Sequence, residues 1–532
     1  MHSTPLLWLR RLALPTLLLL TGLAYLRVLD ADFVVWDDLA LIIHNPLVDG
    51  FHPAIFWTFE PELYAPLALL SFQFEHWLVG FEPTLFHATN LFLHLINVYL
   101  VYLLLTAFPR ANRQTGKPDL LAIFATALFA LHPVQVETIA WVSARKELLW
   151  TLFGLLALLN HLRDQQQSPY AIDRYAPQKI QTLLWVLLAL LSKPTAVIVP
   201  LLIILLDANK LSLKNSIITH RYLLLLSFIF GALALLGKSD TDLALSIFQR
   251  LGLLCMGLFF SIKLIVWPAG LAALHPALEP VSLLSLPYVV AGIATVIFGV
   301  ALWRLRKKIG RCAFAITIFI LSLLPGLLSP VHAQTVTVIS EHYLYFPMIG
   351  IALLAMFGIE NIATKLQSQT KKIFGSIGIL VLLCIISIFT YNQVSVWRDS
   401  PTLFTSVRKL YPRSVAVLTN LGTAYAQMEM YGEAESVLRQ AIGINPDAIQ
   451  ARFNYAGLRY VKGNYVGAIE EYKHVLDRAP LHQDALRMLT WSYYRTGEVA
   501  LAEETYDYII HLNPSLRSQL PSLDIPPERK SM

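Results

Sequence analysis

The sequence predicts an all-α protein in which a membrane part with many spans precedes a block of helical repeats. Of its 532 residues, 56% are hydrophobic and 14% are charged, whereas soluble proteins carry about 25% charged residues. Long apolar runs interrupt the chain up to residue 392, and an ordinary soluble composition follows. A period of 34 residues recurs in this second part. These observations divide the chain into a membrane domain, 1–392, and a repeat region.

Runs of about 17–25 apolar residues cross a bilayer as helices, and they recur throughout the membrane domain. They predict about eleven spans, at residues 12–29, 86–108, 120–132, 147–162, 181–208, 222–237, 251–268, 287–303, 312–328, 347–361 and 373–391. Arg10 and Arg11 precede the first run, but no small-residue cleavage site follows it, so we expect an uncleaved span. The run 181–208 is long for one span and short for two, and whether it crosses once or twice stays open.

The distribution of basic residues predicts the orientation of these spans. Short loops rich in Lys and Arg face the cytoplasm, and here they contain Arg10, Arg11, Arg110, Arg113, Lys117, Arg304, Arg306, Lys307, Lys308, Arg311, Lys371 and Lys372. With eleven spans, the first outer loop 30–86, the loops 133–146 and 329–346 and the repeats are extracytoplasmic. The basic excess is only +6 and lies beside apolar runs, which suits a membrane surface and argues against nucleic acid.

The repeat region, residues 412–514, shows its period in two residue types. Prolines and alanines recur 34 residues apart, at Pro412, Pro446, Pro480 and Pro514 and at Ala434, Ala468 and Ala502. This spacing is typical of three tetratricopeptide repeats, each a pair of helices. Such a stack presents a concave surface to a protein partner, although a packing platform or a dimer contact fits the pattern equally well. We expect a disordered tail at 515–532.

The first candidate for chemistry is the adjacent carboxylates Asp37 and Asp38, which follow the first span and begin the longest outer loop. Adjacent carboxylates repel each other, and one of them, held by a cation, can serve as a base toward an incoming hydroxyl. The alternative is that the pair caps an interfacial helix, because Asp favours the first turn.

A polar stripe follows inside the second predicted span. His87, Asn90, His94 and Asn97 are separated by steps of three, four and three residues, so they share one face of a helix. Such a stripe faces protein or a water-filled cavity, and hydrogen bonding between helices is the expected role of Asn97. A metal ion is not predicted, because no third ligand accompanies the two histidines.

Further titratable residues lie in the outer loops. Glu137 precedes the adjacent bases Arg145 and Lys146, and bases on the outer side run against the positive-inside bias, which suggests a phosphate or carboxylate ligand. Lys193, and Glu341 with the following His342 and Tyr343, are features of the same kind, and local salt bridges are the alternative role for all of them.

Six motifs occur one after another before the repeats: Val-Val-Trp-Asp-Asp, Pro-Leu with Leu-Ser-Phe shortly after it, Phe-His-Ala-Thr-Asn, Leu-His-Pro-Val-Gln-Val-Glu, Leu-Ser-Lys-Pro-Thr and Tyr-Leu-Tyr-Phe-Pro. With the repeats, they resemble the transmembrane-and-tetratricopeptide O-mannosyltransferases and their bacterial relatives in the C-type glycosyltransferase superfamily. The resemblance covers nearly the whole chain. It implies the C-type glycosyltransferase fold for residues 1–392 and a multi-pass protein of the bacterial inner membrane.

The resemblance also implies a reaction, in which a hexosyltransferase moves a sugar from a polyprenyl-phosphate donor to a protein or glycan acceptor on the extracytoplasmic face. Asp37 and Asp38 fall on the two acidic positions of the family motif; Asp37 is the expected catalytic carboxylate, and Glu137 is the next candidate. An inverting transfer also needs cations at the departing phosphate. The expected phosphate-binding residues are Arg145, Lys146, Lys193 and His342, and the expected cavity-lining residues are His87, Asn90, His94, Glu341 and Tyr343.

Two departures from the family pattern leave the sugar unspecified. Where the family often has Tyr-Arg-Pro, this chain has Tyr64-Ala65-Pro66, and where the family has Asp-Arg-Tyr it has Glu341-His342-Tyr343. Each change removes an arginine, and an imidazole is a weaker, pH-dependent phosphate partner. No cofactor is predicted beyond the lipid-linked donor, and a divalent-metal requirement stays open.

Two other classes of function fit part of the sequence. A flippase for lipid-linked saccharides, or a polymer ligase, would share the spans and outer bases but would not need an acidic pair directly after the first span. A non-enzymatic scaffold that anchors the repeats would not need Lys and His at membrane depth. Sugar transfer by the purified protein distinguishes the three.

Overall fold

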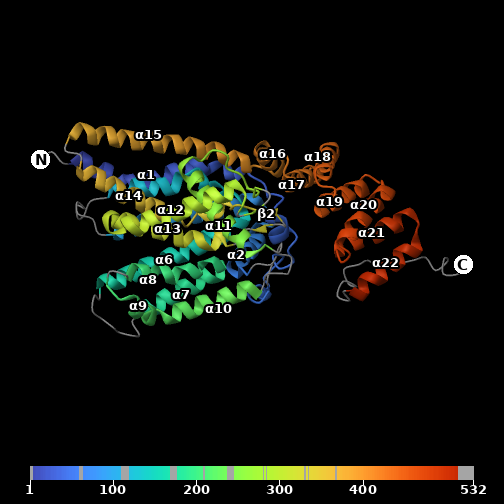
Figure 1. Cartoon of the computed structure of the whole chain (residues 1–532), viewed down its shortest axis with the longest axis horizontal. Helices are drawn as coiled ribbons and strands as arrows, with labels where there is room; N and C mark the ends of the chain where they lie inside the picture. Colours follow the sequence, from blue (N-terminus) through green and yellow to red (C-terminus); the bar gives the residue numbers. More distant parts are fainter. Residues whose placement is uncertain are drawn as a thin grey trace. The chain divides into compact units, whose positions relative to one another are not determined.

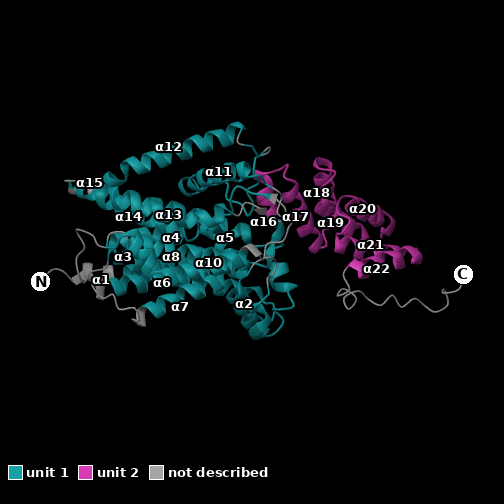
Figure 2. Cartoon of the chain, turned by 60° about the horizontal axis from the view of Figure 1, so that its bottom comes forward, with its two compact units in different colours: residues 1–403 teal, residues 404–532 magenta. Residues whose placement is uncertain are grey.

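A computed structural model describes residues 4–58, 64–108, 119–167, 177–207, 210–236, 245–278, 281–282, 284–328, 331–332, 335–365 and 368–512. The chain divides into two compact units, Met1–Leu403 and Phe404–Met532, coloured separately in Figure 2. The boundary lies between the predicted membrane domain, 1–392, and the predicted repeat region, 412–514. Because almost all of the described elements are helices, the all-α prediction is confirmed.

The first unit is a bundle of long helices, several of which lie lengthwise beside one another (Figure 1). Its α-helices are α1 (Thr4–Tyr25), α2 (Pro66–Val79), α3 (Pro83–Ala107), α4 (Leu120–Leu131), α5 (Val136–Ala140), α6 (Arg145–Gln167), α7 (Pro177–Ser192), α8 (Val199–Asp207), α9 (Leu213–Thr219), α10 (Arg221–Leu236), α11 (Ile247–Val266), α12 (Leu286–Ile309), α13 (Arg311–Leu327), α14 (Met348–Lys365) and α15 (Gln369–Val394). The strands β1 (Val331–His332) and β2 (Thr335–Val336) pair antiparallel. Helix α16 (Ser400–Leu410) crosses the unit boundary.

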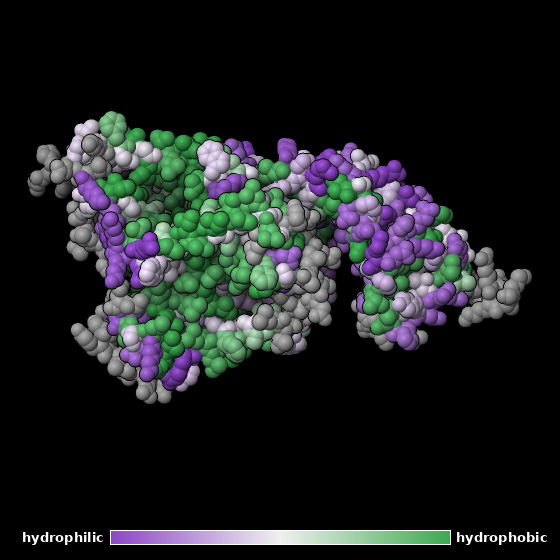
Figure 3. Space-filling model, in the orientation of Figure 1, coloured by the Kyte–Doolittle hydropathy of each residue, from purple (hydrophilic) through white to green (hydrophobic). Residues whose placement is uncertain are grey.

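Six of the described helical segments are long and apolar enough to cross a membrane: Leu12–Asp30, Pro83–Ala107, Ile247–Val266, Leu286–Ile309, Met348–Lys365 and Ile373–Trp397. Two bent pairs raise the number to eight: Leu120–Leu131 with Pro133–Ala140, and Leu213–Thr219 with Arg221–Ala234. Large apolar side chains are exposed on these helices, and they make the visible flank of the first unit predominantly hydrophobic (Figure 3). The chain is therefore a multi-pass membrane protein with six to eight candidate spans among the described residues. The number of about eleven spans stays a prediction, because three shorter apolar helices, Lys179–Ser192, Pro194–Asp207 and Arg311–Leu327, are not included in this count.

The difference in span number comes from helices that are apolar but short or partly polar. The predicted spans at 147–162 and 312–328 correspond to α6 and α13, and α6 ends in polar turns that include Asn160 and Arg163. The run 181–208 is broken after Ser192, because Pro194 holds Lys193 in extended backbone, at φ −162° and ψ 134°. The predicted outer loop 30–86 contains an additional helix, α2.

The broken run 181–208 folds back on itself beside α6. Thr182 of α7 accepts a hydrogen bond from Asn160 at 2.9 Å, and Asp207 of α8 contacts the adjacent His161. Lys193, between the two helices, instead contacts Glu147 in the first turn of α6. The run therefore forms a hairpin whose bend lies at the N-terminal end of α6.

The second unit consists of consecutive helix pairs: α17 (Val415–Gln427) with α18 (Tyr431–Ile444), α19 (Ile449–Val461) with α20 (Tyr465–Arg478), and α21 (Gln483–Thr496) with α22 (Val499–Leu512). The recurring alanines Ala434, Ala468 and Ala502 are fully buried where the paired helices cross. A Cβ at Gly422 would lie 2.5 Å from the Leu438 side chain, so this crossing admits only glycine. The predicted repeats are confirmed as far as residue 512, whereas Pro514 and the tail 515–532 lie outside the described residues.

Candidate active site

The predicted site residues of the outer loops gather at one end of the first unit. The loop after α1 contacts the 141–144 segment through Asp38 and Ser143. Asn90, near the start of α3, donates to the carbonyl of Trp141 at 3.1 Å. The segment Glu341–Leu344 joins them through His342. Four stretches that are far apart in the sequence therefore meet around the N-terminus of α6.

Asp38 is fully buried and holds two of these loops together. Its carboxylate accepts hydrogen bonds from the backbone N–H of Val34 at 3.1 Å, from the N–H of Ser143 at 2.9 Å and from the Ser143 hydroxyl. Burial raises the pKa of Asp38 to about 6, and the three hydrogen bonds limit the rise. Asp38 thus acts as a connector between the loops. It does not cap a helix with its side chain.

Asp37 lies beside Asp38 but has a different environment. Its side chain is 42% exposed, and its Oδ2 lies 3.6 Å from the Nζ of Lys146, whose side chain is only 8% exposed. The Lys146 ammonium also lies 5.6 Å from the ring centroid of Trp141. Asp37 therefore offers a carboxylate that a ligand can reach, next to a cation that the loop Trp141–Ala144 helps to hold.

Arg145, the neighbour of Lys146, is fully buried and turned away from this carboxylate. Its guanidinium forms an ion pair with Glu75, donates to Asn90 Oδ1 at 2.8 Å and to the Phe86 carbonyl at 2.7 Å, and lies 4.6 Å from the ring centroid of Phe72. With its donors used inside the protein, Arg145 joins α2, α3 and α6. A direct contact between Arg145 and a phosphate remains a prediction, and these internal contacts do not favour it.

The sequence analysis did not predict a role for Glu75. The only feature that could have indicated one is the position of this carboxylate within the apolar stretch that forms α2. A second missed carboxylate is Glu147, which forms an ion pair with Lys193 and accepts from the indole N–H of Trp150. The Lys193 ammonium lies 4.4 Å from the ring centroid of Tyr343. Lys193 and Tyr343, both expected at the site, are thus in contact.

Glu137 and His342 form the next contact of the site. His342 Nδ1 lies 2.5 Å from Glu137 Oε1, and its ring packs edge-to-face on Trp141 at 5.4 Å. The other oxygen of Glu137, Oε2, is buried and has no hydrogen-bond partner among the described residues. Glu137 is only 1% exposed, so its contact with His342 is almost completely buried.

Glu341, unlike Glu137, does not contact His342 but contacts the 272–275 segment. It accepts from the Ala272 N–H at 2.6 Å, and its Oε1 lies 2.9 Å from His275 Nε2. Burial raises the pKa of Glu341. Its contacts are those of a residue that fixes the 272–275 segment, and His275 gave no signal in the sequence.

The polar stripe of α3 shares one face, as expected, and most of it bonds to neighbouring helices. His94 Nδ1 lies 2.7 Å from the Tyr345 hydroxyl, and Asn97 donates to the Leu148 carbonyl at 3.0 Å. Asn90 bonds to Trp141 and Arg145. His87 is buried near the backbone of Asp32, and neither ring nitrogen makes a regular hydrogen bond to a described residue. His87 is the member of the stripe whose cavity-lining role the contacts leave open.

Comparison with known proteins first identifies the repeats. The tetratricopeptide repeat family matches residues 415–448 and 467–516. A solved structure, that of MamA, overlaps 21% of this chain and 67% of its own chain at 21% identity, with a TM-score of 0.21. Fold and repeats together define a multi-pass membrane protein that carries tetratricopeptide repeats.

The wider comparison confirms the resemblance stated from the motifs. The chain is 24% identical over 81% of its length to the Protein O-mannosyl-transferase F38B6.6 of Caenorhabditis elegans, and 24% identical, also over 81%, to the Protein O-mannosyl-transferase Tmtc1 of Drosophila melanogaster. A stretch of 160 residues is 34% identical to the mouse Protein O-mannosyl-transferase TMTC1. The chain is thus a distant relative of these proteins, and it spans 62% and 61% of the lengths of the first two.

Proposed function

We propose that this chain is a membrane glycosyltransferase that moves a sugar from a polyprenyl-phosphate-linked donor to a hydroxyl group of a protein or glycan acceptor. The observation that carries the proposal is the accessible Asp37 carboxylate, 3.6 Å from the Lys146 ammonium, at the end of the bundle where Lys193 and His342 also lie. A carboxylate beside an ammonium suits a base and a departing phosphate in one site. The names of the relatives support sugar transfer as the reaction.

In the proposed reaction, the acceptor oxygen attacks the anomeric carbon while its proton moves to an Asp37 oxygen. The bond between the anomeric carbon and the phosphate oxygen breaks, and the electron pair leaves with the polyprenyl phosphate. One displacement of this kind inverts the anomeric configuration and needs no covalent enzyme intermediate. Asp37 is the proposed catalytic residue because, unlike Asp38, it is open to an acceptor.

Lys146 is the cation best suited to the departing phosphate. Lys193 is already held in an ion pair by Glu147, and His342 is held by Glu137. Lys146 is held more loosely, at 3.6 Å, by the carboxylate that takes up the acceptor proton. As Asp37 becomes neutral, its attraction for Lys146 weakens, and the ammonium can turn to the negative charge that develops on the phosphate. Lys193 and His342 complete the proposed phosphate site.

The chain leaves the first unit beside the Asp37 loop, which supports a role of the repeats at the same face of the membrane. The backbone N–H of Asp32 donates to the Arg398 carbonyl at 2.9 Å, and that of Val35 donates to the Ser400 hydroxyl at 2.8 Å. The repeats begin soon after Ser400. We infer that the site and the repeats both face the extracytoplasmic side, where the repeats bind or orient a protein acceptor.

The test is sugar transfer by the purified full chain in lipid nanodiscs, with defined polyprenyl-phosphate sugars as donors and mass spectrometry of the acceptor. The proposal predicts an acceptor that gains one sugar mass and a donor that becomes polyprenyl phosphate. A flippase would move the intact donor across liposomes without consuming it, and a scaffold would do neither. Either of these two results would contradict the proposal.

A further inference from the structure

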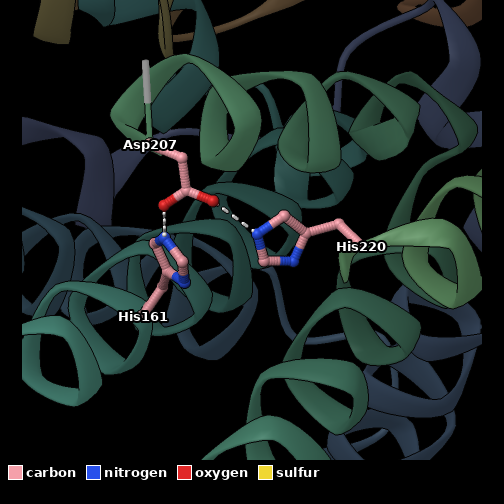
Figure 4. Close-up of side chains that lie close together, drawn as sticks. All are labelled: His161, Asp207 and His220. Carbon is pink, nitrogen blue, oxygen red and sulfur yellow. Dashed lines mark hydrogen bonds and ion pairs between the residues drawn. The ribbon is translucent and has the colours of Figure 1, made fainter. Parts of the chain in front are cut away.

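A second group of titratable residues lies along α6, away from the candidate active site. His161 of α6, Asp207 at the end of α8 and His220 between α9 and α10 point toward one another (Figure 4). His161 Nε2 lies 2.8 Å from Asp207 Oδ1, and His220 Nε2 lies 2.7 Å from Asp207 Oδ2. Two imidazoles, from α6 and from the α9–α10 junction, thus converge on the carboxylate at the end of α8.

This group does not belong to the proposed transferase chemistry. His161 follows Arg145 by sixteen residues in the same helix, which separates the two by about 24 Å at 1.5 Å per residue. The three side chains are 10%, 4% and 12% exposed in chain order. Two imidazoles and a carboxylate in such a protected position call for an explanation of their own.

The atoms that face one another are those that bind transition metals. One ligand atom from each residue lies within 4.8 Å of the other two, and no other group of three His, Cys, Asp or Glu in the described part of the chain meets this condition. Ligands around a tetrahedral Zn²⁺ lie about 2.0–2.2 Å from the ion, which puts them about 3.3 Å from one another. Small side-chain rotations would bring the three atoms to these distances.

The contacts of Gln165 favour a cation over a simple hydrogen-bond network. Its amide nitrogen lies 2.9 Å from His161 Nε2 and also contacts Asp207 Oδ1. If His161 Nε2 carries a proton that it donates to Asp207, this N–H faces the Gln165 amide nitrogen, which is also a donor. If the Gln165 amide is reversed, its oxygen instead faces the Asp207 carboxylate, and two acceptors meet. A cation on His161 Nε2 and Asp207 removes this conflict, because the reversed amide oxygen then faces positive charge.

We propose that His161, Asp207 and His220 bind one divalent transition-metal ion, of which Zn²⁺ fits best. Two imidazole nitrogens and one carboxylate oxygen match its preferred ligands, and the two neutral imidazoles disfavour Ca²⁺ and Mg²⁺, which take mainly oxygen. Ser216, whose hydroxyl lies 3.0 Å from Asp207 Oδ2, and Gln165 are near enough to complete the shell. The ion would join the ends of α6 and α8 to the α9–α10 junction as a structural site.

The test measures bound metal in the full chain, purified in detergent without a histidine tag and dialysed against metal-free buffer. We expect about one Zn²⁺ per chain, as in protein sites with this ligand set. The double variant His161→Gln and His220→Gln keeps hydrogen-bond donors toward Asp207 but removes both imidazole ligands, and it should retain less than about a tenth of the metal. The control His474→Gln with His511→Gln removes two exposed histidines of the repeats and should retain all of it.

A wild-type chain that holds no more Zn²⁺ than the double variant, also after incubation with excess Zn²⁺, would overturn the proposal and leave a hydrogen-bonded cluster. If the double variant does not fold, cobalt(II) titration of the wild-type chain decides. A visible absorption band of tetrahedral cobalt, saturating at one equivalent and removed by Zn²⁺, supports the site, and its absence overturns it. Neither result depends on glycosyltransferase activity, so the two proposals fail separately.

Discussion

The carboxylate of Asp37 lies 3.6 Å from the ammonium of Lys146, and each residue has a sequence neighbour of the same charge that is turned inward. Asp38 is bonded to Ser143, and Arg145 is paired with Glu75. In both adjacent pairs, therefore, one residue holds neighbouring segments together and the other faces the site. This division of roles distinguishes residues that sequence alone presents as equivalent.

Substitution of Arg145 should mainly lower stability, and substitution of Lys146 should mainly lower activity. Arg145→Gln leaves Glu75 buried without its partner, and such a loss costs about 3–5 kcal/mol of folding free energy. Lys146→Gln removes only a loosely paired ammonium and should leave thermal stability in detergent nearly unchanged, but lower the transfer rate about 10²-fold or more. Thermal unfolding and the turnover of folded protein separate the two effects. Equal losses of stability would contradict the assigned roles.

The buried Asp38 predicts a pH dependence of stability. Its pKa rises from 3.8 to about 6 on folding, so the folded state binds the proton more tightly than the unfolded state. Stability therefore falls as pH rises from about 4 to about 6 and is constant above that range, with a change of about 3 kcal/mol at 1.36 kcal/mol per pKa unit. The Asn side chain of the variant Asp38→Asn cannot ionise, so its unfolding temperature should not show this decline between about pH 4 and about pH 6. Parallel curves for the two proteins would refute the prediction.

The orientation of the spans makes a prediction that fusion proteins can test. Alkaline phosphatase is active only outside the cytoplasm, so a fusion after residue 514 should be active. A fusion after Lys308, in the basic last turn of α12, should be inactive. The reverse pattern would put both the repeats and the proposed site on the cytoplasmic side, and the extracytoplasmic assignment would be wrong.

Deletion of the repeats should separate catalysis from acceptor binding. The proposed catalytic residues all lie in the first unit, so a chain that lacks residues from 412 onward should transfer sugar to a small acceptor at a nearly unchanged rate. Modification of the native protein acceptor should weaken, because the surface that orients it is missing. Equal loss with both acceptors, in protein that remains folded, would instead mark the repeats as necessary for the membrane unit.

The sequence predicted those features that depend on local pattern. The 34-residue period gave the helix pairs, because each repeat needs small residues such as Ala434 and Ala468 at its crossing. Long apolar runs gave most of the spans, and the spacing of His87, Asn90, His94 and Asn97 gave a shared face of α3. Each of these patterns is complete within a few helical turns.

Features that depend on helix neighbours could not be predicted in this way. Arg145 and Glu75 are 70 residues apart, and nothing in either segment shows that α2 packs beside α6. The same holds for His161 with Asp207 and His220, which meet only because the run 181–208 folds back at Pro194. The number of spans also depends on helix neighbours, since short or partly polar helices inside a bundle need not have the length and hydropathy of an isolated span.

The transfer rate of Asp37→Asn, compared with that of Asp38→Asn, tests the central claim most directly. Asn keeps the size of Asp but cannot take the proton of the acceptor hydroxyl, and loss of a positioned base costs about 10²- to 10⁴-fold in rate. At matched expression and thermal stability, Asp37→Asn should lose activity by this factor, and Asp38→Asn should lose less. If Asp37→Asn instead retains more than about a tenth of the rate, Asp37 is not the base, and Glu137, with its unused buried oxygen, becomes the residue to test.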